Sequence, residues 1–104
     1  MLTNKQEGMK EEILAEMAQG ATLEEIKDRA GEWIDNHLPI YNHEIIKEWQ
    51  EMPSEYDDQG AEFYGVGADW ITIIRLMILD LHYYYSDLLD EVFNEIEQDQ
   101  AVSA

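Results

Sequence analysis

The stretch that decides the fold is residues 80–100, DLHYYYSDLLDEVFNEIEQDQ, which holds seven carboxylates and no lysine or arginine. Asp87, Glu91, Glu95 and Asp99 recur at every fourth position, and side chains at that spacing are neighbours on a helix. Like charges there destabilise a helix by about 0.2–0.5 kcal/mol per pair. Interleaved lysines would remove this cost, so their absence indicates that the acidity serves something beyond the helix itself.

Apolar spacing predicts that this stretch belongs to one long helix from about residue 70 to 99, opened by an Asp69 cap. One stripe comprises Ile71, Ile74, Ile78, Leu81, Tyr85, Leu88 and Val92. In the first half the opposite face is apolar too, with Ile73, Leu76, Met77, Tyr83 and Tyr84. A helix that is apolar all round should be buried all round. We therefore expect a homodimer, with Ile73, Met77, Tyr83 and Tyr84 at its interface, and a buried Asp80 that pairs with a base or accepts hydrogen bonds.

Three further helices are predicted upstream. The first covers about residues 6–19 and stops at Gly20. The second opens at Thr22-Leu-Glu-Glu25, a capping box, and ends at Pro39. The third runs from an Asn42 cap to Pro53, and residues 53–68 form a long acidic loop without clear period. The fold class is therefore all-α, about four helices in a single domain over 1–104, with frayed residues 100–104.

Charge dominates the composition. The 104 residues contain 24 acids against six bases, for a net charge of −18. From Glu48 onward there are fourteen acids and one base, Arg75. A field of this strength repels nucleic acid and anionic membranes and attracts basic partners.

The composition also excludes several classes of protein. The chain has no cysteine, which excludes disulfides and thiolate metal sites and fits a cytoplasmic location. The N-terminus shows no signal peptide, and the most apolar run, residues 70–79, is about half a membrane span. We therefore expect a soluble protein.

Motifs for catalysis or metal binding are missing from the sequence. His43-Glu44 would begin a zinc motif, but Lys47 stands where the second histidine is needed. If Gly60 held the sixth position of a calcium loop, Val66 would occupy the twelfth, which requires glutamate. We expect no enzyme activity, no metal and no cofactor.

The carboxylates themselves are the candidate site. Solubility requires a net charge of about 2–8 units in a small domain, and this chain carries more than twice that. Carboxylates four residues apart rise about 6 Å along a helix, and rows on several helices could approximate the phosphate density of DNA. The predicted phosphate-mimicking residues are Glu24, Asp28, Glu32, Asp35, Glu44, Glu48, Glu51, Glu55, Asp57, Asp58, Glu62, Asp87, Asp90, Glu91, Glu95 and Asp99.

A family resemblance points the same way. The pattern Asp35-Asn36-x-x-Pro39-x-Tyr41, an acidic aromatic loop and a long helix ending in LLDEVFNEIEQ resemble the Ocr family of bacteriophage antirestriction proteins, from about Leu23 to Gln98. The resemblance implies a helical, dimeric mimic of bent B-form DNA that evades host defence by inhibiting type I restriction-modification enzymes. This chain is shorter and lacks a continuous acidic C-terminal tail.

Two alternatives remain open on the sequence. An acidic adaptor or chaperone-like protein would bind basic proteins such as DNA-packaging or histone-like factors. A structural protein would form a helical oligomer in a virion with a charged exterior. Displacement of the protein from its partner by duplex DNA is expected only of the mimic.

Overall fold

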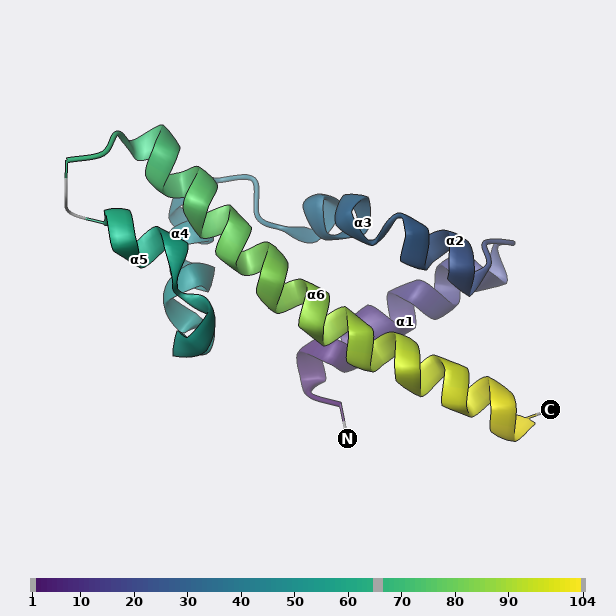
Figure 1. Ribbon diagram of the computed structural model, residues 1–104. Helices are drawn as coiled ribbons and strands as arrows, with labels where there is room; N and C mark the ends of the chain where they lie inside the picture. Colours follow the sequence, from purple (N-terminus) through teal and green to yellow (C-terminus); the bar gives the residue numbers. More distant parts are fainter. Residues whose placement is uncertain (1, 65–66, 104) are drawn as a thin grey trace. The chain divides into compact units, whose positions relative to one another are not determined.

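The computed structural model describes residues 2–64 and 67–103, and within these ranges the chain is helical without a strand (Figure 1). Its helices are α1 (Asn4–Ala18), α2 (Leu23–Asp28), α3 (Ala30–His37), α4 (Asn42–Glu51), α5 (Gln59–Phe63) and α6 (Trp70–Ser103), with a 3₁₀ turn η1 (Ser54–Tyr56). The predicted all-α class and long C-terminal helix are confirmed. The predicted dimer remains a prediction.

The chain forms two compact units, which we name the terminal unit (Met1–Trp33 with Ser86–Ala104) and the central unit (Ile34–Tyr85). The assignment of one domain to residues 1–104 stays a prediction.

The terminal unit begins with a capping box that the sequence prediction missed. The Thr3 hydroxyl accepts a hydrogen bond from the Gln6 backbone N–H, and the Gln6 side chain accepts one from the Thr3 N–H. Helix α1 therefore starts at Asn4 rather than near residue 6. The core of this unit comprises Met9, Ile13, Leu23, Ile26, Trp33, Leu89, Val92, Phe93 and Ile96.

The single helix predicted between Thr22 and Pro39 is wrong, because the chain leaves helical geometry at Arg29. Thr22 caps α2 as predicted by accepting from the Glu25 N–H, but α2 ends after Asp28. Gly31, a poor helix former, lies just beyond the break. After the second segment Leu38 is buried, whereas His37 at the end of α3 is exposed.

The central unit has a core drawn from α3, α4 and α6. Its buried apolar side chains are Ile34, Leu38, Ile45, Trp49, Met52, Ile73, Ile74, Met77, Leu81 and Tyr85. Where the sequence predicts a loop over 53–68, the described residues contain η1 and α5, and residues 65 and 66 lie outside the described ranges. Helix α4 starts at Asn42 itself, and Tyr41 occupies the cap position without a side-chain bond.

The burial of side chains on α6 differs from the prediction, both at the predicted dimer interface and along the predicted apolar stripe. Ile73 and Met77 are buried within the chain, so they belong to the protomer core and not to a subunit seam. Ile71, predicted inward, is 66% exposed, and Leu89 rather than Leu88 is buried. Of the other two predicted interface residues, Tyr83 is exposed, and half-buried Tyr84 packs its ring against Tyr56 and Tyr85. Their place in a dimer interface stays a prediction.

The two ends of α6 bear on two smaller predictions. The Asp69 carboxylate accepts from the Thr72 N–H at 2.8 Å, which confirms the predicted cap and lowers the pKa of Asp69. The helix continues to Ser103 rather than ending near residue 99, and Gln100 and Ala101 are good helix formers.

Candidate anionic surface

Nearly all of the carboxylates lie on the surface. Of the 24 acids, every one is exposed except buried Asp80 and half-buried Glu48, Asp57 and Glu95. Thirteen of the sixteen predicted phosphate-mimicking residues are thus exposed. The remaining question is which of them are held by other side chains.

The predicted row Glu91, Glu95 and Asp99 faces helix α1 within the terminal unit. The Gln6 amide donates to Glu91 at 2.6 Å and to the Leu88 carbonyl at 3.3 Å. Lys10 Nζ lies 2.9 Å from Asp99 and 3.9 Å from Glu95. This row is therefore not a uniform free surface, because one lysine neutralises part of it.

The hydrogen bond to Asp99 raises the pKa of Lys10 above its ordinary value, with further contributions from the charges of Asp99, Glu95 and Glu7. The other flank of α6 repeats the arrangement, since Lys27 pairs with Glu97 and its pKa is raised by that bond. Lys27 also lies 5.9 Å from the centre of the Phe93 ring. The two lysines thus fix the two flanks of the acidic half of α6.

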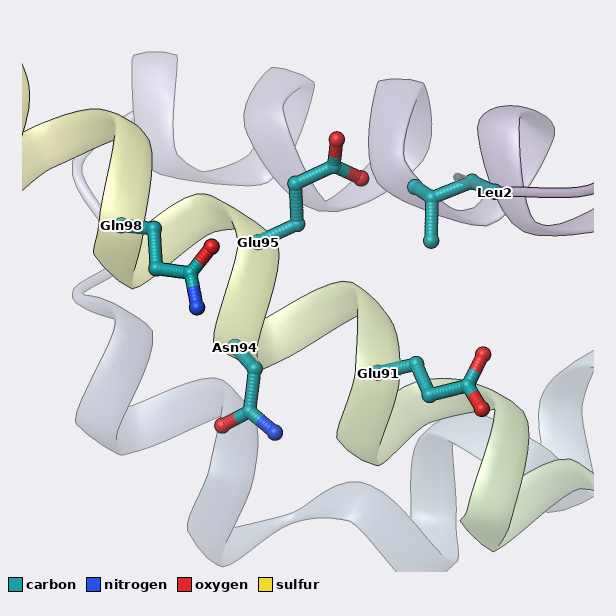
Figure 2. Close-up of a pocket in the computed structure, with 5 residues that line it drawn as sticks. All are labelled: Leu2, Glu91, Asn94, Glu95 and Gln98. Atoms are coloured by element: carbon teal, nitrogen blue, oxygen red, sulfur yellow. The ribbon is translucent and has the colours of Figure 1, made fainter.

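Two polar hollows lie in the terminal unit. One, of about 380 Å³, is lined by Leu2, Glu91, Asn94, Glu95 and Gln98 (Figure 2). A second, of about 340 Å³, is lined by Lys27, Ala30, Asp90, Phe93 and Asn94. Figure 2 shows the polar side chains of the first hollow spread along successive turns of α6. Neither arrangement brings together a nucleophile, a base and an oxyanion donor.

Asp80 is the one buried carboxylate, and it accepts hydrogen bonds as the sequence predicted for a buried residue at this position. Its donors are Trp49 Nε1 at 2.9 Å, the Gly60 N–H at 2.9 Å and the Gln59 N–H at 3.1 Å. These bonds join α4 and the start of α5 to α6. Asp80 therefore fixes the start of α5, within the acidic segment that the sequence predicts as a loop.

Two other predicted acids of the central unit are held by hydrogen bonds. Asp35 contacts His82 at 2.6 Å, and Glu48 accepts from the Tyr85 hydroxyl at 2.7 Å. Burial raises the pKa of Tyr85 strongly, and the bond to Glu48 adds to the shift. The exposed acids that complete this unit's predicted set are Glu44, Glu51, Glu55, Asp58 and Glu62, beside half-buried Asp57.

The sequence prediction omitted a second group of exposed acids. Glu7, Glu11, Glu12 and Glu16 on α1 are all exposed. They form two pairs four residues apart, Glu7 with Glu11 and Glu12 with Glu16, on a helix that also carries Lys5 and Lys10. The anionic surface of the terminal unit therefore includes α1 as well as α2 and α6.

Within the described ranges, no cluster of three or more histidine and carboxylate side chains is suited to hold a metal ion. No helix formed by the described residues has the length and apolar character that crossing a membrane requires. No protein-family model, curated protein or solved structure matches this chain. The resemblance to the Ocr family therefore stays a prediction from the sequence.

Proposed function

We propose that this protein is a DNA mimic that inhibits a DNA-binding enzyme by occupying its cationic groove. The observation that carries the proposal is the exposure of 20 of the 24 carboxylates in a chain of net charge −18. A groove lined with lysine and arginine attracts such a surface electrostatically, as it attracts the phosphates of DNA.

The way the acids are held supports mimicry over a merely soluble surface. A ligand with charges already in place loses less entropy on binding than a flexible acidic tail. Here most of the exposed carboxylates lie on helices, and Asp80, Thr3 and Thr22 fix the starts of α5, α1 and α2 by hydrogen bonds. The acids are thus presented in fixed order without a cleavable phosphodiester.

The target class comes from the sequence resemblance. The pattern shared with the Ocr family favours a host defence enzyme of the type I restriction-modification class. In this proposal the protein acts in the host cytoplasm, uses no cofactor and catalyses no reaction.

The proposal is tested by capturing partners from a bacterial lysate on the immobilised protein at low salt. Bound proteins are then released with duplex DNA or with polyglutamate of equal total charge. We expect duplex DNA to release DNA-binding enzymes at concentrations where polyglutamate does not. Equal release by both polyanions would favour the acidic adaptor instead, and no release by duplex DNA would contradict the mimic.

Charge-matched variants test whether the position of the acids matters. The triple variant E44Q/E51Q/E62Q neutralises three exposed acids of the central unit, and E7Q/E11Q/E16Q removes the same charge from α1. If each lost contact costs about 0.2–1 kcal/mol, the first triple weakens target binding about 3- to 150-fold. Because α1 lies outside the stretch that resembles the Ocr family, we expect a smaller effect from the second triple, measured by titration against the captured enzyme. Equal effects would mean that only net charge counts, and a collapse from one single substitution would indicate a discrete site.

A further inference from the structure

Two large aromatic side chains that contact each other are exposed where α5 ends and α6 begins. Tyr64 is 49% exposed, and Trp70, the first residue of α6, is 58% exposed. Their ring centres lie 6.4 Å apart with the ring planes at 73°, an edge-to-face contact. We name these two residues the aromatic pair. The other two tryptophans of the chain, Trp33 and Trp49, are buried, so the exposure of Trp70 indicates an interaction site.

The aromatic pair rests on the core of the central unit. The Tyr64 ring stacks on Trp49, with the ring centres 6.3 Å apart and the planes at 24°. Trp49 is itself buried, and its Nε1 donates to buried Asp80 at 2.9 Å. The backbone of Trp70 belongs to α6. The two rings are therefore already in place, and this lowers the entropic cost of binding a ligand on them.

The charges beside the aromatic pair are negative. Glu62 lies two residues before Tyr64, Asp69 directly precedes Trp70, and both acids are exposed. From residue 48 to the end of the sequence the one base is Arg75. The face of an aromatic ring is also negative because of its quadrupole, so it attracts cations. Rings and carboxylates at this place therefore favour the same ligand, a cation with an apolar face.

We propose that the aromatic pair binds an arginine side chain from the cationic groove of the protein's target. This inference rests on the proposed function, because it takes the partner to be rich in arginine and lysine. A guanidinium is planar, stacks on aromatic faces, is more weakly hydrated than an ammonium and can bind a carboxylate through two hydrogen bonds. The aromatic pair thus adds a preference for arginine over lysine to an attraction that otherwise depends on charge.

Nucleic acid and a second copy of the chain fit this surface less well. Proteins that stack bases on aromatic side chains place those side chains in positively charged grooves. Glu62 and Asp69 would instead repel the phosphates that accompany a base. A second copy would bring the same two carboxylates to the contact. An arginine of a basic protein meets neither repulsion.

Two peptides of equal charge, nona-arginine and nona-lysine, test the proposal before a target is known. Their affinities for the native protein and for variants are measured by titration calorimetry. The double variant Tyr64→Leu/Trp70→Leu removes both aromatic faces and keeps every carboxylate. We expect it to weaken nona-arginine binding about 2- to 5-fold, the value of one exposed cation–π contact, and to weaken nona-lysine binding less.

A matched control removes two exposed tyrosines elsewhere in the central unit. Tyr41 and Tyr83 are 64% and 57% exposed. The double variant Tyr41→Leu/Tyr83→Leu should keep the affinity of the native protein for both peptides. Circular dichroism checks that both double variants keep their helical content. Equal losses of nona-arginine affinity in the two double variants would overturn the proposal.

A second readout uses the native chain and does not depend on the folding of a variant. Each tryptophan indole N–H gives one signal in a nitrogen–proton NMR spectrum, and the Trp70 signal is the one that Trp70→Leu removes. Nona-arginine should shift this signal more than nona-lysine does, and should leave the signal of buried Trp33 in place. A Trp70 signal that stays unchanged at saturating nona-arginine would contradict arginine binding at the aromatic pair.

The same signal distinguishes the other occupants. A shift of the Trp70 signal with oligothymidylate, or with rising concentration of the protein alone, would identify nucleic acid or a second copy as the occupant and overturn the proposal. Failure of the proposed function has a different sign. If duplex DNA released no captured partner while the arginine preference depended on Tyr64 and Trp70, the DNA mimic would be contradicted and the arginine site would stand.

Discussion

The two halves of helix α6 treat their acids in opposite ways. Residues 70–85 contain one carboxylate, Asp80, which is buried and bonded to three donors. Residues 86–103 contain six, of which five are exposed and four contact Gln6, Lys10 or Lys27. In the central unit, the carboxylate of α6 is buried and accepts hydrogen bonds that join neighbouring helices. In the terminal unit, most carboxylates of the same helix form part of the surface. The role of a carboxylate in this helix therefore depends on which groups donate hydrogen bonds to it.

The largest expected effect comes from disrupting the hydrogen bonds that buried Asp80 accepts. In Asp80→Asn, an NH₂ group takes the place of one carboxylate oxygen and faces donors from Trp49, Gln59 or Gly60. Leaving buried donors unsatisfied should reduce the free energy of unfolding by about 2–4 kcal/mol in urea denaturation. Asp90→Asn, an exposed change on the same helix, should stay within about 0.5 kcal/mol. If the two substitutions changed the free energy of unfolding equally, the hydrogen bonds of Asp80 would not stabilise the fold as we infer.

A pair of glycines sharpens the same contrast between the units. A Cβ added at Gly60 would lie 3.0 Å from both Met77 Cγ and Trp49 Nε1, whereas one at Gly8 meets nothing within 4 Å. Gly60→Ala should therefore destabilise the protein by about 1–3 kcal/mol. Gly8→Ala should stabilise α1 by about 0.5–1 kcal/mol. Thermal unfolding of both variants measures the two signs, and a stabilised Gly60→Ala would refute the tight packing around Asp80.

The smallest effect belongs to the surface half of α6. Lys10→Gln removes the base between Glu95 and Asp99, and should lower the midpoint of thermal unfolding slightly, more at low salt than at high salt. Because the bond to Asp99 raises the pKa of Lys10 in the folded chain, its stabilisation is present below the ordinary value of 10.5 and disappears as pH rises through the higher folded value. The difference between native and variant should accordingly be constant from about pH 7 to 9 and vanish in strong alkali. A difference that persists there would assign it to packing instead of charge.

The sequence predicted what depends on local pattern and missed what depends on distant contacts. Helical class, the Asp69 and Thr22 caps and the acceptor role of Asp80 follow from residue type and spacing. The Thr3–Gln6 capping box is a local pattern of the same kind, although the sequence prediction does not include it.

The wrong predictions concern a helix with apolar residues on two faces, because its sequence does not determine which face is buried. Both faces of residues 70–85 fit the same helical period. The sequence therefore predicts Ile71 in the core and Ile73 and Met77 at a dimer interface, whereas Ile71 is exposed and the other two are buried. Likewise, the pairing of Lys10 with Glu95 and Asp99 joins residues more than 80 positions apart, which no local pattern shows.

The most direct test of the central claim is competition with DNA on one purified target. A type I restriction-modification enzyme is bound to a fluorescent duplex containing its recognition site, and the protein is titrated in while anisotropy is recorded. We predict full release of the duplex, with an apparent affinity for DNA that falls in proportion to the concentration of the protein. If the protein bound the captured or purified DNA-binding enzyme while the duplex stayed in place, the enzyme's groove would not be its site and the DNA-mimic account would be contradicted.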